Sequence, residues 1–230
     1  MPEQLGVSDI LSTLGLASAL NKFEIQEFTL TQGDPLVPRS NRLGDVVEEL
    51  PIARVEEYEL SLIIKEHSVN SVALVLGGAG YGTGANALCI TGVTLRQVPN
   101  DFPTLSIKCH RHPVLVSGAS HNPRKYTITL PNLGWGIQGV LSITGAVPEE
   151  LTGYTLDVSI DHQDHFDREG TKFLIGGSTN CRLEETLEVL KSTTVTLAAG
   201  WFADPRSEKE RSAEYKTKTL KHHKHQAPDS

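Results

Sequence analysis

The sequence predicts a mainly β protein made of two related β-sandwich or barrel lobes, preceded by one helix and a long N-terminal arm. Segments in which apolar and polar residues alternate recur along the chain, separated by clusters of Gly, Pro, Asn and Asp, as strands and their turns are. One such segment is written twice: Phe102–His112 is identical or chemically similar to Tyr215–His225 at eight of eleven positions.

Each copy of this repeated segment has an upstream counterpart. Tyr58–His67 resembles Tyr154–His162 in its alternation and in ending on a histidine. Self-similarity over a unit this long indicates a duplicated fold rather than a solenoid, whose repeats are shorter and more numerous. The predicted divisions are an arm over 1–57, a first lobe over 58–113, an inserted hairpin and linker over 114–153, and a second lobe over 154–230.

The arm begins with the one predicted helix, Ser8–Asn21, in which Ser8 is a candidate N-cap and apolar residues follow helical spacing. This helix packs either on its own subunit or on a neighbouring one. In Phe23–Thr31 the apolar residues change phase part of the way along, which predicts a strand with a bulge. The Pro- and Gly-rich stretch Gln32–Pro51 predicts a long loop, and such loops are usually functional or ordered by a partner.

Strands are predicted in the first lobe at Tyr58–Lys65, Val72–Leu76 and Ala87–Leu95. The glycine-rich run Gly77–Gly84 lacks the spacing and the following helix of a dinucleotide-binding loop, and no Lys-Ser or Lys-Thr follows it as in a P-loop. We interpret it as a hairpin tip.

The inserted segment predicts a hairpin of Tyr126–Leu130 and Val140–Thr144, with Trp135 on the turn between them. An aromatic side chain on a long turn is a typical interface anchor, although folding back onto its own core is an equal alternative.

The second lobe predicts strands at Tyr154–Ile160, Lys172–Ile175, Cys181–Leu190 and Thr193–Ala199, with charged loops at Asp161–Gly170 and Asp204–Ala213. The leucine spacing of Cys181–Lys191 also fits a helix, but its place opposite the strand near Cys89 in the duplication favours a strand.

Composition limits the classes of function. The formal charge is −7, and residues 1–66 account for all of it with twelve acids against five bases. An acidic surface disfavours tight binding to nucleic acid, but it is compatible with a surface along which nucleic acid slides. Three cysteines are too few, and an odd number, for a disulfide framework. The sequence shows neither a secretory signal nor an apolar run long enough to span a bilayer, so we expect synthesis in the cytoplasm and no membrane partner.

Nine histidines suggest a metal site, because His110 with His112, or His223 with His225, would share one face of a strand. The alternative is that the histidines are polar residues at a strand end that the duplication repeats. A catalytic metal site would also need a carboxylate or another base nearby, and the sequence does not place one there. No nucleophile elbow is present, and the adjacent pair Cys109–His110 points to opposite faces. We therefore predict no catalytic, cofactor-binding or metal-binding residues and no enzyme.

With its long arm and its repeated strand, as in "DFPTLSIKCHRH" and "YTLDVSIDHQD", the chain resembles structural proteins of tailed-phage virions, and tail-tube proteins most closely. The resemblance covers residues 58–225 and rests on architecture. It implies a homo-oligomeric ring of β-sandwiches or barrels, loops and termini that bridge stacked rings, an acidic channel through which DNA passes as cargo, and other virion proteins as partners.

The expected function is therefore a self-assembling virion protein, made in the host cytoplasm and built into the virion. The alternatives are a capsid, decoration or head-to-tail connector subunit, a carbohydrate-binding or adhesive β module, and a metal-dependent hydrolase.

Overall fold

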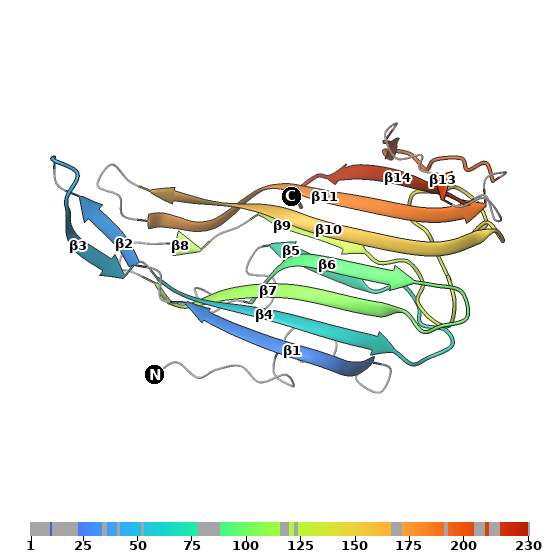
Figure 1. Cartoon of the computed structure of the whole chain (residues 1–230), viewed down its shortest axis with the longest axis horizontal. Helices are drawn as coiled ribbons and strands as arrows, with labels where there is room; N and C mark the ends of the chain where they lie inside the picture. Colours follow the sequence, from blue (N-terminus) through green and yellow to red (C-terminus); the bar gives the residue numbers. More distant parts are fainter. Residues whose placement is uncertain are drawn as a thin grey trace.

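A computed structural model of the whole chain shows a mainly β protein (Figure 1). The structure describes residue 10 and residues 23–33, 36–40, 42–51, 53–77, 88–115, 120–121, 124–166, 172–190, 193–204, 210–211 and 217–229. The strands are β1 (Phe23–Gly33), β2 (Leu36–Ser40), β3 (Val46–Pro51), β4 (Ala53–Ile64), β5 (Ala73–Gly77), β6 (Cys89–Gln97), β7 (Thr104–Leu115), β8 (Ser120–His121), β9 (Lys125–Thr129), β10 (Leu151–Phe166), β11 (Lys172–Leu190), β12 (Phe202–Ala203), β13 (Glu210–Arg211) and β14 (Thr217–Gln226).

One large sheet organises the molecule, with the strand order β1-β4-β7-β6-β10-β11-β14-β12. Neighbours along this path are antiparallel. β5 branches from β6 and pairs with β9, whereas β2 and β3 form a separate hairpin. Figure 1 shows this hairpin and the adjoining ends of β10 and β11 at one end of the molecule, and the turn from β6 to β7 at the other.

The core lies on one face of the large sheet because alternate residues of the central strands are apolar. In β4, Tyr58, Leu60 and Leu62 are buried while Glu57 and Glu59 are exposed. The same alternation runs through β7, β6, β10 and β11. Side chains of β5, of β9 and of the irregular segments at 130–147 and 197–201 complete the core.

Several predictions about single elements are confirmed. β1 is a strand whose pairing with β4 shifts between Ile25 and Glu27, which is the predicted bulge. The segment from Cys181 to Leu190 is a strand rather than a helix. The run Gly77–Gly84 lies outside the described residues, apart from Gly77.

Other predictions about single elements are wrong. The stretch Gln32–Pro51 holds the β2–β3 hairpin, whose backbone ladder tolerates its prolines, and the hairpin turns at Gly44 with a φ of 89°. β10 extends to Phe166, through the described part of the expected loop Asp161–Gly170, and pairs there with β11. β9 pairs with β5 and not with Val140–Thr144, so the expected hairpin around Trp135 does not form. The described residues of Thr193–Ala199 form no strand and contribute only the isolated bridge between Ile143 and Leu197.

Neither the two duplicated lobes nor the N-terminal helix is confirmed. β7 lies between β4 and β6, whereas β14 lies between β11 and β12, so the two copies of the repeated segment have different neighbours within one sheet. The helix over Ser8–Asn21 lies outside the described residues except for Ile10, which is fully buried. The division of the chain into domains stays a prediction.

Candidate functional site

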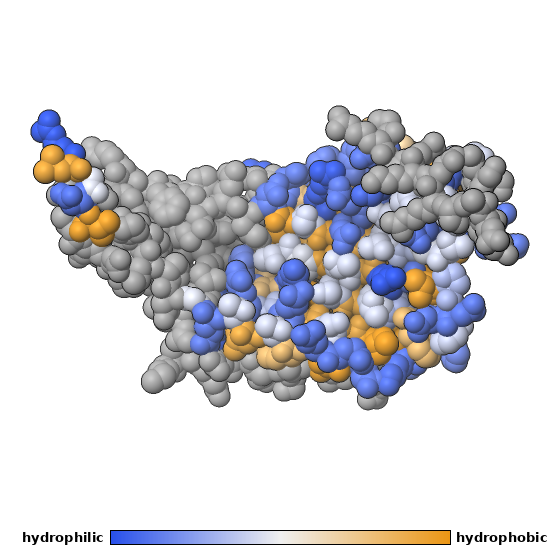
Figure 2. All heavy atoms as spheres, viewed as in Figure 1, coloured by the Kyte–Doolittle hydropathy of each residue, from blue (hydrophilic) through white to orange (hydrophobic). Residues whose placement is uncertain are grey.

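The candidate site is the face of the large sheet that points away from the core, here called the open face. Its register places a polar residue at nearly every outward position of seven adjacent strands. Eleven of these residues carry a hydroxyl group: Thr29, Thr31, Ser61, Thr91, Thr94, Thr104, Ser106, Thr155, Ser159, Thr186 and Thr219. Figure 2 shows hydrophilic and pale residues spread over these strands with smaller hydrophobic areas between them.

Charged residues of the open face are mainly acidic. Eight carboxylates, on Glu24, Glu27, Glu57, Glu59, Asp157, Asp161, Glu184 and Glu188, lie among four bases, Arg96, Lys108, Arg182 and Lys221. Acidic groups spread over a surface repel phosphate, whereas hydroxyl groups form neutral hydrogen bonds. The face is therefore hydrophilic without being a strong binding surface for nucleic acid.

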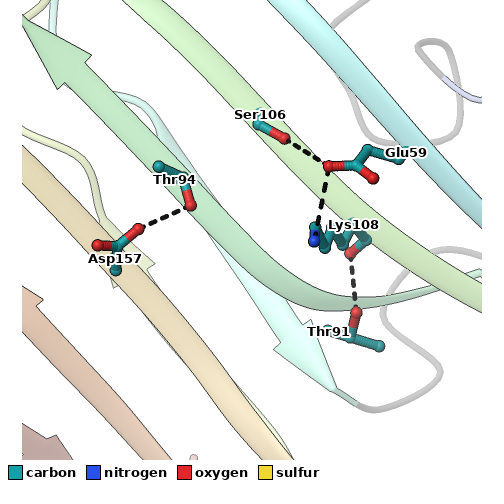
Figure 3. A network of polar contacts seen from close by, with 6 residues as sticks. All are labelled: Glu59, Thr91, Thr94, Ser106, Lys108 and Asp157. Carbon is teal, nitrogen blue, oxygen red and sulfur yellow. Dashed lines mark hydrogen bonds and ion pairs between the residues drawn. The ribbon is translucent and has the colours of Figure 1, made fainter.

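Short polar contacts connect neighbouring strands on this face (Figure 3). Thr94 Oγ1 donates a hydrogen bond to Asp157 Oδ1 at 2.8 Å, and Ser106 Oγ donates to Glu59 Oε1 at 3.4 Å. Lys108 Nζ lies 3.6 Å from the same Glu59 oxygen. Both side chains of this ion pair are more than half exposed, so it adds little stability and serves mainly to hold their positions.

A shallow hollow of about 290 Å³ lies over β1, β4, β7 and β6 on this face. Its lining is mixed in charge and includes Thr29, Glu57, Glu59, Lys108 and His110. Ligand sites are usually enclosed and mainly apolar, with a few converging polar groups. This hollow lacks that character, so it does not define a small-molecule site.

The two ends of the sheet differ. β1 is an eleven-residue edge strand that pairs with β4 on one side, and no described strand pairs with its other side. At the opposite end, the two-residue strands β12 and β13 cover part of β14. An exposed edge strand is a template for pairing with another chain, and short covering strands block that pairing. The β1 edge is therefore the open one among the described strands.

A buried ion pair lies beneath the open face on the β1 side. Glu56 is fully buried and accepts hydrogen bonds from Arg111 Nε at 2.5 Å, from the Tyr58 hydroxyl at 2.5 Å and from Gln32 Nε2 at 3.2 Å. These contacts join β1, β4 and β7. Burial, together with the bond to Glu56, raises the pKa of Tyr58 to about 12.

A second buried carboxylate lies beneath β11. Glu185 accepts hydrogen bonds from the backbone N–H groups of Leu141 and Ser142 at 2.9 and 2.8 Å, and from the Tyr154 hydroxyl at 2.6 Å. The Ser142 hydroxyl also contacts His222 Nδ1 at 2.8 Å. Burial raises the pKa of Glu185 and lowers that of His222, so the low dielectric favours the neutral form of each.

Sequence reasoning missed both buried carboxylates, although the chain contained a signal for them. Glu56 falls in phase with Tyr58 and Leu60, and Glu185 falls in phase with Leu183 and Leu187. A carboxylate on the apolar phase of a strand is buried, and a buried carboxylate needs a partner. Arg111 carries the same signal, because it falls in phase with Ile107 and Cys109 on β7, whereas Ser142 lies in an irregular segment and carries none.

His223 and His225 share one face of β14, as the sequence predicted, and their ring centroids are 6.1 Å apart. His223 stacks on Phe202 at 5.8 Å between ring centroids, and His225 Nδ1 lies 3.1 Å from the Asn180 side-chain oxygen. His222 faces the core instead. In the part of the chain that the structure describes, no three His, Cys, Asp or Glu side chains gather as metal ligands would.

Buried thiols offer no nucleophile either. Cys89, Cys109 and Cys181 are free and buried, and burial raises the pKa of Cys89 and of Cys181 to about 12. A thiol in such an environment stays protonated and inert. Among the described residues there is also no helix long and apolar enough to cross a membrane.

Trp135, the expected interface anchor, rests against its own subunit. Its ring meets Phe102 edge to face at 4.8 Å between centroids and lies 6.2 Å from the His67 ring. The side chain remains 39% exposed, so one part of it is available for contact with another molecule.

No protein-family model matches the chain, and no curated protein is similar to it in sequence.

Proposed function

We propose that this chain is a non-enzymatic, self-assembling structural protein of a virion, specifically a tail-tube subunit. In this proposal copies of the chain associate side by side into a ring, the open faces line a central channel, and DNA passes through the channel as cargo. The subunit is made in the host cytoplasm and contacts other virion proteins in the finished particle.

The observation that carries the proposal is the open face together with the uncovered β1 edge. A sheet with one apolar and one polar face separates a packed layer from an aqueous space. The acid-rich, hydroxyl-rich composition of the open face suits a wall along which a polyanion slides without binding. Pairing the β1 edge with a neighbouring copy removes an aggregation hazard and continues the wall.

A second candidate, a carbohydrate-binding β module, is favoured by the partly exposed ring of Trp135 beside a cleft. Such a module functions as a monomer that binds glycans, so the state of assembly distinguishes the two candidates.

The proposal is tested by sedimentation velocity and negative-stain microscopy of the purified full chain over a range of concentrations. We expect closed rings or stacked tubes with a central channel. A chain that stays monomeric at high concentration contradicts the proposal, and glycan binding by that monomer supports the second candidate.

A further inference from the structure

A cleft of about 350 Å³, here called the tryptophan cleft, lies at the end of the large sheet where β6 turns into β7. One wall comes from that turn, and the other comes from the irregular segment between β9 and β10 together with the first residue of β10. Figure 1 shows the turn from β6 to β7 at the end of the molecule opposite the β2–β3 hairpin. No described residue that lines the cleft belongs to the open face, so the two surfaces are separate.

The tryptophan cleft is amphipathic. Six of its ten lining residues, including Trp135, carry apolar side chains. Three others carry planar polar groups, namely Asn100, Gln138 and Glu149. Ligand sites combine an apolar lining with a few polar groups that fix the orientation of the ligand. This lining therefore suits a ligand that has both an apolar face and several hydrogen-bonding groups.

The loop that presents Trp135 is fixed by hydrogen bonds. The Trp135 N–H donates to the His67 carbonyl at 3.3 Å. Gln97 is fully buried, and its side chain accepts from the Gln138 N–H at 2.8 Å and donates to the Asn132 carbonyl at 3.2 Å. One buried amide thus holds both ends of the loop. A preformed site binds its ligand without the entropic cost of ordering itself.

The Trp135 ring lies at the surface as a platform. Phe102 packs edge to face against it at 4.8 Å between centroids, yet Trp135 remains 39% exposed. The other tryptophan of the chain, Trp201, is only 7% exposed. The face of an aromatic ring is electron-rich and attracts polarised C–H groups. A pyranose ring offers such C–H groups on its flat face, while its hydroxyl groups project from its edge.

The polar side chains of the cleft have hydrogen-bonding groups to spare. Gln138 Nε2 donates to the Trp135 carbonyl at 2.6 Å, which leaves its second N–H and its acceptor oxygen for a ligand. The side chains of Asn100 and Glu149 are exposed and form no hydrogen bond or ion pair with another described residue. Two amides and a carboxylate supply both donors and acceptors, and neighbouring hydroxyl groups of a sugar need both.

Charge around the cleft limits the ligand to a neutral molecule. Glu149 lines the cleft, and Asp101 and Glu150 are exposed next to lining residues in the chain. No lysine or arginine is among the described residues that line it. Carboxylates repel an acidic ligand, so sugars that carry a carboxylate or sulfate are disfavoured.

From this geometry we propose that the tryptophan cleft is a binding site for a neutral saccharide. The C–H face of one pyranose unit stacks on the exposed part of the Trp135 ring, and its hydroxyl groups form hydrogen bonds with Asn100, Gln138 and Glu149. The inference does not depend on the proposed self-assembly, because the cleft lies outside the open face. It gives the chain a carbohydrate ligand whether the chain is assembled or monomeric.

Quenching of tryptophan fluorescence in the full chain tests the site. Iodide reaches the exposed Trp135 and not the buried Trp201, so quenching reports on the cleft. We expect methyl β-glucopyranoside, methyl β-galactopyranoside or cellotetraose to protect the fluorescence from iodide, with saturation at about millimolar concentrations. Cellotetraose and the methyl glycosides distinguish a site for a longer glycan from one for a single sugar. Glucuronic acid, which has a similar shape and a negative charge, should bind about tenfold more weakly or not at all.

Variants of the cleft identify the residues that bind, with affinity measured by isothermal titration calorimetry. Trp135→Ala should lower the affinity by about tenfold or more. Asn100→Gly, which suits the φ of 62° at that position, and Glu149→Ala keep the hydrogen bonds of the tryptophan loop, and each should lower the affinity by about threefold or more. Lys108→Ala on the open face is the matched control and should leave the affinity unchanged. Circular dichroism checks that each variant is folded.

The outcomes separate this inference from the proposed function. If none of the neutral sugars protects Trp135 at tens of millimolar, or if binding is unchanged in both Trp135→Ala and Asn100→Gly, the tryptophan cleft is not a saccharide site. Sedimentation velocity on the same preparations tests the proposed function separately. Rings that bind no sugar overturn the inference and leave the proposed function in place, whereas a sugar-binding monomer supports the inference and contradicts the proposed function.

Discussion

The buried ion pair between Glu56 and Arg111 provides the sharpest test of how the sheet is held together. Glu56 has no exposed surface, the Arg111 side chain is 7% exposed, and their closest atoms are 2.5 Å apart. Replacing Glu56 with Ala leaves the guanidinium buried without this carboxylate and also removes the acceptor for the Tyr58 hydroxyl. Breaking one partner of such a pair costs about 3–5 kcal/mol.

Folded domains of this size are stable by about 5–15 kcal/mol, so we expect Glu56→Ala to lose about a fifth or more of the stability. Urea denaturation at pH 7, followed by circular dichroism, measures this loss. The control is the double variant Glu56→Leu with Arg111→Met, which replaces both charges by apolar groups of similar size. It should lose clearly less stability than Glu56→Ala, because no buried charge is left alone and only the Tyr58 hydroxyl loses its acceptor. A loss below about 1 kcal/mol for Glu56→Ala, or equal losses for the single and double variants, refutes the reasoning.

Three further predictions concern protonation, thiols and metal. Burial lowers the pKa of His222, so the unfolded chain takes up a proton at this residue before the folded chain does as the pH falls below about 6.5. The free energy of unfolding therefore decreases as the pH falls. His222→Asn should make the free energy of unfolding, measured by urea titration, less dependent on pH between pH 7 and pH 5. Cys89, Cys109 and Cys181 should react with a thiol reagent only after unfolding, and reaction of the native protein would contradict their burial. If the histidines are structural, a chelator should leave the melting temperature unchanged and elemental analysis should find zinc below one equivalent, whereas a clear loss of stability would revive a metal site.

Alternation along single strands made much of the sheet predictable from the sequence. In β4, β10 and β11 every second residue is apolar over long runs, and this pattern survives because one face packs on a core and the other meets water. Even the bulge in β1 was visible as a change of phase at Ile25.

Pairing between distant segments was not predictable in the same way. The stretch Gln32–Pro51 has a loop-like composition, yet it holds a hairpin whose backbone ladder runs from the pair Leu36 and Pro51 to the pair Ser40 and Val46. Thr193–Ala199 alternates like a strand but forms no strand among its described residues, because only Leu197 finds a bridge partner. The intrinsic propensity of a segment limits which secondary structures it can form, and its tertiary contacts determine which of these it forms.

For the candidate site, too, the features of single strands were predictable and the contacts between distant segments were not. The polar residues of the open face were predictable in each strand separately, but their arrangement as one surface depends on the strand order, which the sequence did not predict. Glu56 and Arg111 lie 55 positions apart, and Glu185 and Ser142 lie 43 apart, so no local pattern connects them.

The central claim is that the open face lines a channel in a self-assembled ring. A three-dimensional reconstruction of the assembled particle by electron cryomicroscopy tests it most directly. We expect the side chains of Glu59, Lys108 and Asp157 to face the central channel, with the β1 edge paired to a neighbouring copy. A particle in which these side chains face outward, or are buried against another protein, contradicts the claim.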